Sequence, residues 1–441
     1  MTLELVGFLL LAAQPEATMR VSLKQAVEVA LAPEGSPKMA IAQETMRQAE
    51  ARRLETRGDL LPNLESSVAD HRETVNLKAF GFNFNFPTIN GFSFAIPSIV
   101  GPFSVFDARV TVQQTMLDFS TIRRYQASKV NETAAKSDFD ATKNQISDQV
   151  ARAYLTTLRA DAALATARAN VQLSQALLDQ ARRLKDAGTG TGIEVTRAEV
   201  QLANDQQRLV VATDDRRRAA LNLLRAMGLK LDTPIELTDA LSYKAADIGD
   251  LNSALAVARE MRAELKAQKQ REVSARFNYS SVKDERLPSV AADANYGTIG
   301  TGLIGNQPTY TYGFSVRVPV FDGGKRDYRR EETFSQYRQE QARLRDLEQQ
   351  VELDVRLAFD SVHAAESEVK TAEDGLQLAR QELAQAQRRY LAGVANGIEV
   401  TDAQNRLARA QENEIAALYD YNVARIDLAT ATGRIREYVN Q

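Results

Sequence analysis

The stretch GTGTGIEVT, residues 188–196, lies between two long proline-free segments and decides the fold. Before it, from residue 119 to residue 187, apolar side chains recur every four positions, as they do from Ile146 to Leu158. This spacing is typical of the buried stripe of a helix. At about 1.5 Å per residue, the segment predicts a helix on the order of 100 Å long. Because glycine tolerates the backbone of a chain reversal, residues 193–227 are predicted to return as a second long helix.

The sequence repeats this hairpin. GVANGIEVT, residues 393–401, matches GTGTGIEVT at an offset of 205 residues, and the same offset relates Gly228 to Gly433 and Leu202 to Leu407. Agreement at one fixed offset over both limbs indicates two copies of one supersecondary unit. The long helices are therefore predicted at residues 119–187 and 193–227 in the first copy and at 325–391 and 398–432 in the second.

Before each helical hairpin the apolar pattern changes to a period of two, which is typical of strands. In the segment 103–116, Asp107 and Arg109 fall on one face, whereas Phe106 and Val110 fall on the other. Four strands are predicted, at about 64–76, 103–116, 290–298 and 309–321. The apolar faces of these strands carry Phe106, Val110, Tyr296, Tyr310, Tyr312 and Phe314.

This apolar strand face has two interpretations. In a soluble sandwich it would be core, whereas in a membrane barrel it would face lipid, with polar groups toward the lumen. Four strands cannot close a barrel alone, and open strand edges do not occur in lipid, so a barrel requires several chains. The long helices favour a duct over the alternative, which is a soluble elongated coiled-coil scaffold protein.

The rest of the chain is organised around the two copies. Residues 1–17 contain an apolar run that is too short to span a bilayer, and we interpret them as a signal peptide. The alternative is a buried N-terminal segment, because the run is preceded by Glu4 and by no lysine or arginine. Repeat 1 is expected at 18–228, a linker at 229–249, repeat 2 at 250–433 and a C-terminal tail at 434–441. Shorter helices are predicted at 21–31, 38–58 and 250–285, the first with Ser22 as its N-cap. The phenylalanine-rich segment 78–102 is either an exposed hairpin arm or an aromatic-stapled loop.

Composition argues against several functions. The formal net charge of -3 offers no basic surface for nucleic acid. The chain has no cysteine, and its two histidines, His71 and His363, are far apart in sequence. The glycine-rich stretch 188–192 follows a helix rather than a strand and is not followed by lysine, so a nucleotide site is not expected. No catalytic, cofactor or metal site is predicted, and the chain is not expected to be an enzyme.

Several motifs give the chain a family resemblance. The dipeptide LP precedes the first strand of each copy, at 61–62 and 287–288, FDGG opens the second long hairpin at 321–324, and YLAG ends its first limb at 390–393. With these motifs and its duplication, the chain resembles the outer-membrane efflux protein family, the TolC-like exit ducts of Gram-negative bacteria, over nearly its whole length. The resemblance implies an α+β membrane protein. In a protein of this family, three chains would form a twelve-stranded β-barrel, and a twelve-helix periplasmic α-barrel would continue it.

The resemblance also implies a function. The chain would be a passive exit duct of the cell outer membrane, with a long periplasmic extension and a wall against outer-membrane lipid. It would serve tripartite efflux or type I secretion as a homotrimer. Its partners would be a periplasmic adaptor, or membrane fusion protein, and an inner-membrane transporter, which supplies the energy.

The same resemblance assigns residues at the helical reversals. Glu194, Tyr390, Glu399 and Asp402 would form the periplasmic entrance, where acidic side chains constrict the lumen. The alternative for Glu194 and Glu399 is an ordinary acid in a first helical turn, favoured by the helix dipole. Where some members of the family have an arginine, this chain has Ala395, so a salt-bridged latch of that kind lacks its arginine. The adaptor would dock on Gly188, Thr189, Gly190, Gly192, Gly393, Val394 and Gly397.

Overall fold

The computed structural model describes residues 18–32, 35–82, 97–245 and 249–440. The expected signal peptide, residues 1–17, and the middle of the phenylalanine-rich segment, residues 83–96, lie outside this part of the chain. The chain divides into two compact units. The helical unit comprises residues 1–46, 135–267 and 344–441, and the sheet unit comprises residues 47–134 and 268–343.

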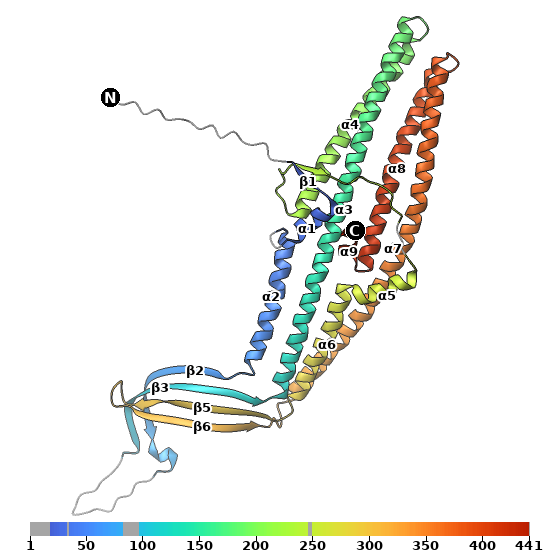
Figure 1. Ribbon diagram of the computed structural model, residues 1–441. Coiled ribbons are helices and arrows are strands. Elements are labelled where there is room, and N and C mark those ends of the chain that lie inside the picture. Colours follow the sequence, from blue (N-terminus) through green and yellow to red (C-terminus); the bar gives the residue numbers. More distant parts are fainter. Residues whose placement is uncertain (1–17, 33–34, 83–96, 246–248, 441) are drawn as a thin grey trace, which may run out of the picture. The chain divides into compact units, whose positions relative to one another are not determined.

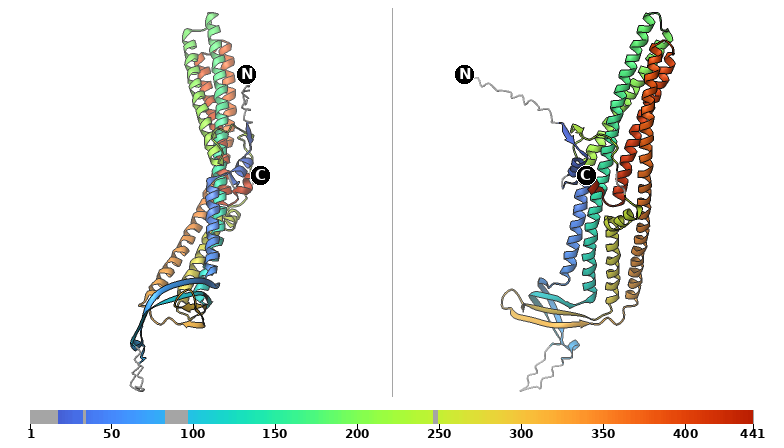
Figure 2. Two further views of the ribbon diagram at one scale, coloured as in Figure 1. Left: turned by 90° about the vertical axis from the view of Figure 1, so that its left-hand side faces the viewer. Right: turned by 45° about the vertical axis from the view of Figure 1, so that its right-hand side comes forward.

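Two long helical hairpins dominate the fold. The first consists of α3 (Phe119–Asp186) and α4 (Gly192–Met227), and the second of α7 (Lys325–Leu391) and α8 (Gly397–Ala431). The first and last residues of these four helices each lie within one residue of the predicted ends. Within the helical unit the two hairpins lie side by side (Figures 1 and 2).

The hairpins of the helical unit are held by apolar clusters on the predicted stripes. Ile146, Val150 and Tyr154 of α3 are almost fully buried, and they belong to the largest cluster together with Leu223 and Met227 of α4. A second cluster joins α7 to α5 (Leu251–Met261), and two more follow the seam between α7 and α8. Burial of these stripes holds the helices together, because helical propensity alone is weak.

Short elements complete the largest cluster, and the sequence did not reveal most of them. Strand β1 (Met19–Val21) pairs in parallel with β4 (Ile235–Leu237), which lies in the expected linker. Helix α9 (Ile435–Val439) lies in the expected tail. Elements of three to five residues show no period, so they are recognised only by burial, which is complete or nearly so for Val21, Ile235 and Ile435.

Four of the predicted boundaries were wrong. The strand expected at 103–116 is longer, since β3 begins at Ile99. The helix expected at 21–31 is α1 (Leu23–Leu31). Its predicted N-cap, Ser22, is confirmed, whereas Val21 belongs to β1. The helix expected at 250–285 is two helices, α5 and α6 (Ala263–Asp284), because Arg262 leaves the helical conformation. Its guanidinium there pairs with Asp354, at 3.1 Å. The strand expected at 309–321 ends at Arg317, since Pro319 has no N–H to donate to a ladder.

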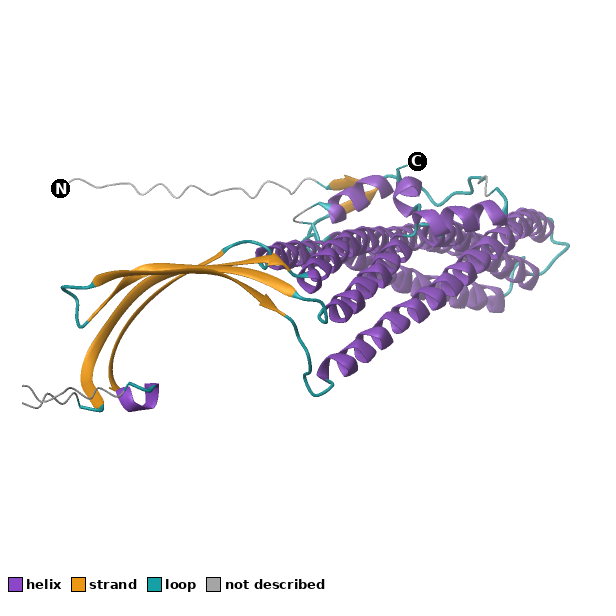
Figure 3. Cartoon of the chain, turned by 90° about the horizontal axis from the view of Figure 1, so that it is seen from below, coloured by secondary structure: helices purple, strands orange, loops and turns teal. Residues whose placement is uncertain are grey.

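The sheet unit contains one antiparallel sheet of four strands, which curve together as one layer (Figure 3). The order is β2-β3-β5-β6, with both copies contributing two adjacent strands. The elements that form and flank it are α2 (Pro37–Gly58), β2 (Asn63–Asn76), the 3-10 turn η1 (Leu77–Phe80), β3 (Ile99–Leu117), β5 (Ser289–Gly300) and β6 (Gln307–Arg317). The first two strands, β2 and β3, pair antiparallel.

The register gives the sheet two different faces. It aligns Ser66, Val110, Tyr296 and Tyr310 across all four strands, so these side chains share one face. The predicted apolar residues lie on that face, whereas Asp107 and Arg109, which form an ion pair, lie on the other. The second face also carries Glu65, Asp293, Asn295, Thr309, Thr311 and Arg317.

Candidate channel entrance and membrane face

Both helical reversals use the same backbone geometry. Gly188 and Gly393 have φ of 75° and 72°, a conformation that glycine adopts without strain. Their amides and those of the next residues donate to carbonyls of the last helical turn: Thr189 N to Leu184 O at 2.9 Å, and Val394 N to Arg389 O at 3.1 Å. These bonds satisfy the helix ends from within the chain. Of the residues assigned to docking, Gly190 and Gly397 are half-buried, and Gly188, Thr189, Gly192, Gly393 and Val394 are exposed.

Glu194 connects the two reversals. Its Oε2 accepts a hydrogen bond from the backbone N–H of Thr191, at 3.0 Å, which caps the start of α4. Its Oε1 accepts one from the backbone N–H of Gly397, at 3.4 Å, at the start of α8. One half-buried carboxylate therefore serves two helix N-termini, and both favour its negative charge.

Tyr390 lies beside this carboxylate. Its half-buried ring packs against the apolar cluster of α7 and α8, which includes Leu383 and Val400. Burial raises the pKa of the Tyr390 phenol, and the negative charge of Glu194 adds to this effect. Glu194, Tyr390 and Gly397 line the same small cavity of about 40 Å³ between the two hairpins. The structure thus brings two of the four predicted entrance residues together.

The other two predicted entrance residues lie apart from this cavity. Glu399 is exposed, and its Oε1 lies 2.9 Å from Nε of Arg389, on the facing limb of the same hairpin. Its backbone N–H is capped by Asn396. Asp402 is exposed, and within the described part of the chain its carboxylate has no ion-pair or hydrogen-bond partner. The second hairpin therefore presents one paired and one unpaired acid near its tip.

Sequence reasoning missed a buried polar network close to the tips. Ser174 of α3 donates to Asp205 of α4 and accepts from Nε2 of Gln404 of α8, at 2.6 Å. Gln201 and Arg208 also donate to Asp205, at 3.2 and 3.1 Å. A comparison of the two repeats could have revealed this network. At the offset of 205, the polar Ser174 and Asp205 of the first copy correspond to the apolar Ala379 and Ala410 of the second copy.

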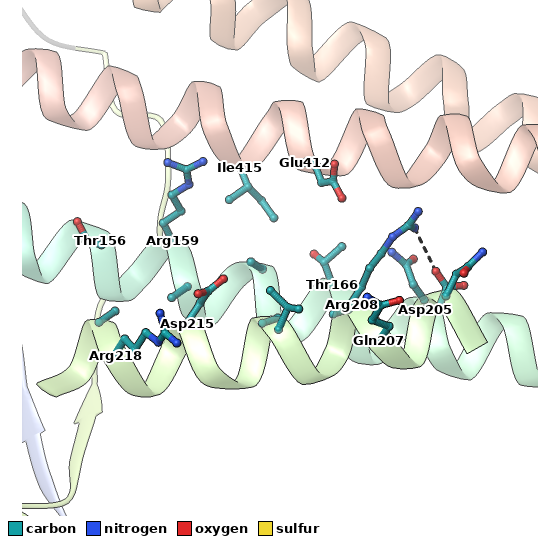
Figure 4. A pocket seen from close by; sticks show the side chains of 18 of the residues that line it. Thr156, Arg159, Thr166, Asp205, Gln207, Arg208, Asp215, Arg218, Glu412 and Ile415 are labelled. Carbon is teal, nitrogen blue, oxygen red and sulfur yellow. Dashed lines mark hydrogen bonds and ion pairs between the residues drawn. The ribbon is translucent and has the colours of Figure 1, made fainter. Parts of the chain in front are cut away.

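A groove opens beside this network. Its volume is about 820 Å³, and it lies between α3, α4 and α8. Figure 4 shows Arg208 turned toward Asp205 at one end, Arg159 near the other end, and Ile415 and Glu412 contributed by α8. Small side chains such as Ala163, Ala167 and Ala212 line this space.

The apolar face of the sheet is exposed. Tyr296, Tyr310, Tyr312 and Phe314 keep between 67% and 78% of their surface accessible, and the rings of Tyr310 and Tyr312 stack. Val110 is exposed as well and Phe106 is half-buried. An exposed aromatic surface of this size marks a contact with lipid or protein, whereas the opposite face is polar.

Among the residues that the structure describes, no helix is both long enough and apolar enough to cross a bilayer.

The features together define a class of protein. Duplicated helical hairpins with acidic tips, combined with a sheet that is apolar on one face and polar on the other, are the parts of a membrane channel with a long helical extension. The family model described as "Outer membrane efflux protein" matches residues 29–229 and 254–434, so the chain belongs to the outer membrane efflux protein family.

Individual relatives are distant but cover much of the chain. Outer membrane protein TolC of Vibrio cholerae is 24% identical over 311 residues, which is 69% of this chain and 71% of TolC. Pyoverdine export outer membrane protein OpmQ of Pseudomonas putida is 23% identical over 93% of this chain and 85% of its own. The crystal structure of VceC from Vibrio cholerae has a TM-score of 0.80 at 19% identity, covering 93% of this chain and 96% of VceC.

Family membership settles the general role. The chain is an outer-membrane exit duct for efflux or secretion, with its helical extension in the periplasm. The family consists of channel proteins rather than enzymes, and the fold is that of its solved channels, mostly helical with some sheet.

Proposed function

We propose that three copies of the chain close one twelve-stranded barrel in the outer membrane. The observation that carries this proposal is the sheet, because β2 and β6 each have one edge without a strand partner among the described residues. Open edges are not stable in lipid, so the edges of several sheets must pair with one another. A barrel of about twelve strands exceeds the eight-stranded size whose interior side chains fill, and thus leaves a polar lumen.

The exposed tyrosine face favours this duct over a soluble scaffold. In a scaffold the apolar face would be buried against another layer, but Tyr310, Tyr312 and Phe314 remain largely accessible. In a barrel these rings face lipid, with tyrosine suited to the interface, and Asp107, Arg109 and Asp293 face the water-filled lumen.

In the proposed duct the cargo is not changed chemically. A periplasmic adaptor would dock at the tips of both hairpins, on the exposed residues around Gly188, Thr189, Gly393 and Val394, and an inner-membrane transporter would supply the energy. OpmQ is named for pyoverdine export, and PrtF of Dickeya chrysanthemi for protease secretion. Support for an equivalent role here comes from the shared fold and from the matching geometry of the two tips.

We assign different tasks to the predicted entrance residues. Asp402 and Glu399 would face the lumen near the tips, where three copies form a ring of negative charge that attracts cations. Glu194 and Tyr390 would hold the two hairpins of one copy together, because Glu194 contacts Gly397 of the other hairpin.

Single-channel recording in planar bilayers tests this function. The wild-type protein should conduct, and divalent cations added at the tip side should block its current. Glu399→Ala combined with Asp402→Ala should weaken that block, whereas Asp374→Ala, which changes an exposed acid further along α7, should not. A protein that is monomeric in detergent by native mass spectrometry, or that dissolves without detergent, contradicts the duct. Unchanged block in the double variant would remove these acids from the entrance.

A further inference from the structure

The segment that joins the two repeats crosses the helical unit as an extended chain. It begins with β4 (Ile235–Leu237) and continues through residues 238–245, which form neither helix nor turn. The sequence predicts only a linker here, at 229–249. We call residues 235–244 the linker strap, because their contacts reach all four long helices of the unit.

The four long helices follow one another in the order α4, α3, α8 and α7. Arg216 of α4 pairs with Asp161 of α3, at 2.9 Å. Arg152 of α3 pairs with Asp427 of α8, and an apolar cluster joins α8 to α7. Three helix-to-helix steps therefore separate α4 from α7.

The first half of the linker strap contacts α4 and α3. The backbone oxygen of Ile235 accepts a hydrogen bond from the guanidinium of Arg216, at 3.4 Å. The carboxylate of Asp239 accepts one from the hydroxyl of Tyr154 on α3, at 2.7 Å. Because Tyr154 is almost fully buried, this second contact is anchored in the largest apolar cluster.

The second half of the linker strap contacts α8 and α7. The backbone oxygen of Lys244 accepts a hydrogen bond from the hydroxyl of Tyr421 on α8, at 2.8 Å, and Asn422 donates to the strap at 3.2 Å. The hydroxyl of Tyr243 donates to Glu366 of α7, at 2.7 Å. Each of the four helices is thus tied to the strap by a side chain of its own.

The linker strap has little spare length. Its nine residue-to-residue steps from Ile235 to Lys244 span at most about 32 Å when the chain is fully extended. Three steps between packed helices, at about 8–10 Å each, cover about 24–30 Å. A chain that is about as long as the distance it crosses resists any separation of the helices it ties together.

We propose that the linker strap sets the spacing of the four helices, and thereby the girth of the duct at this level. The spacing concerns one copy alone, whereas the girth rests on the proposed trimer, in which three straps would act around one tube. The strap acts far from the entrance, since the helical rise places Gly393 about 40 Å along α7 from Glu366. The linker thus has a role separate from that of Glu194 and Tyr390.

Distances between spin labels test the spacing. Arg218→Cys on α4 and His363→Cys on α7 are exposed label sites, and the absence of native cysteine makes labelling specific. Doubly labelled chains are diluted with unlabelled chains, so that double electron–electron resonance reads the α4-to-α7 distance within one copy. Insertion of two glycines after Ala240, inside the strap, should lengthen this distance by up to about 7 Å. The same insertion after Ala245, just beyond the strap, is the matched control and should leave the distance unchanged.

A second variant loosens the strap at constant length. Tyr243→Phe combined with Asn422→Ala removes one contact to α7 and one to α8, and should broaden the same distance distribution. Glu194→Ala, which releases the tips, should leave this distribution unchanged. The strap has no role in the spacing if the distance stays the same both in the insertion after Ala240 and in the double variant.

Singly labelled chains measure the girth. With His363→Cys alone, the measured distances are those between copies, and the insertion after Ala240 should lengthen them, whereas the insertion after Ala245 should not. Between-copy distances that ignore both insertions overturn the girth assignment and leave the trimer standing. The absence of any between-copy distance means that the chain is a monomer, which removes the proposed function itself.

Discussion

Glu194 illustrates how one side chain combines local and distant roles. Its carboxylate caps α4 through Thr191 and also holds Gly397, which is 203 residues away in the sequence. An acid in a first helical turn is explained by the helix dipole alone, so the local role could be predicted from the sequence. The distant role could not, because nothing in a single sequence shows that the start of α8 lies within reach.

Removal of the Glu194 carboxylate should loosen both helix starts. We expect Glu194→Ala to cost about 1 kcal/mol of local stability, the usual cost of losing an N-terminal cap. The amides of Thr191 and Gly397 should then exchange with deuterium roughly fivefold faster, since about 1 kcal/mol is a factor of that order. Glu199→Ala is the matched control, because Glu199 pairs with Arg182 on the exposed surface of the same hairpin. If these two amides exchanged at the same rate in both variants, Glu194 would not stabilise the two helix starts.

The linker contact of Tyr243 should respond to alkaline pH. Its hydroxyl donates to Glu366 of α7 at 2.7 Å, and this hydrogen bond, with burial and the charge of Glu366, raises the pKa of Tyr243 to about 12. The neutral phenol is thus favoured in the folded chain. Its contribution to stability is therefore complete below about pH 10, which is the pKa of tyrosine in an unfolded chain. This contribution is lost as the pH rises through the raised pKa of Tyr243 in the folded chain.

Tyrosinate absorbance measures this titration. Tyr243→Phe should remove one late-ionising tyrosine and should reduce the loss of stability between about pH 10 and 12. Tyr310→Phe, at an exposed position on the sheet, is the control and should leave that alkaline change in place. Identical alkaline profiles for wild type and Tyr243→Phe would show that the contact does not couple to folding.

At the scale of elements, length decided what could be predicted. The long helices repeat their apolar stripe over many turns, and the central strands alternate over a dozen residues, so their existence and order follow from the sequence. Strands β1 and β4 and helix α9 are too short to show a period, and only their burial in the main cluster defines them. At the break between α5 and α6, Arg262 pairs with Asp354, a long-range contact that the sequence does not show.

The buried polar network should act as one unit. Asp205→Ala leaves the hydroxyl of Ser174 and the amide of Gln201 without their acceptor, and each unsatisfied buried group costs about 1–3 kcal/mol. We expect a loss of roughly 2–3 kcal/mol in the free energy of unfolding in detergent. The double variant with Ser174→Ala, which reproduces Ala379 and Ala410 of the second hairpin, should cost less than the sum of the single changes.

Unfolding by urea in detergent micelles provides the measurement for the network. Asp214→Ala is the matched control, because Asp214 is an exposed acid on the same helix that pairs with Arg218. This control should change stability by less than about 0.5 kcal/mol. Strict additivity of the Ser174 and Asp205 changes would mean that the network is a set of independent bonds.

The two faces of the sheet should tolerate charge differently. Tyr312 and Thr311 are neighbours on β6 and lie on opposite faces. Tyr312→Lys places an ammonium on the face that we assign to lipid, where lysine costs up to about 2–4 kcal/mol near the bilayer midplane. Thr311→Lys places it toward the lumen and should change conductance instead of assembly. Heat-resistant assembled protein in outer-membrane fractions is the readout, and equal assembly of both variants would remove the lipid assignment.

At the scale of the whole molecule, the repeat explains why one chain is incomplete. In the part of the chain that the structure describes, the outer edges of β2 and β6 have no strand partner, so the sheet must be completed from outside the chain. The resemblance of the sequence to a trimeric family implied the number of copies.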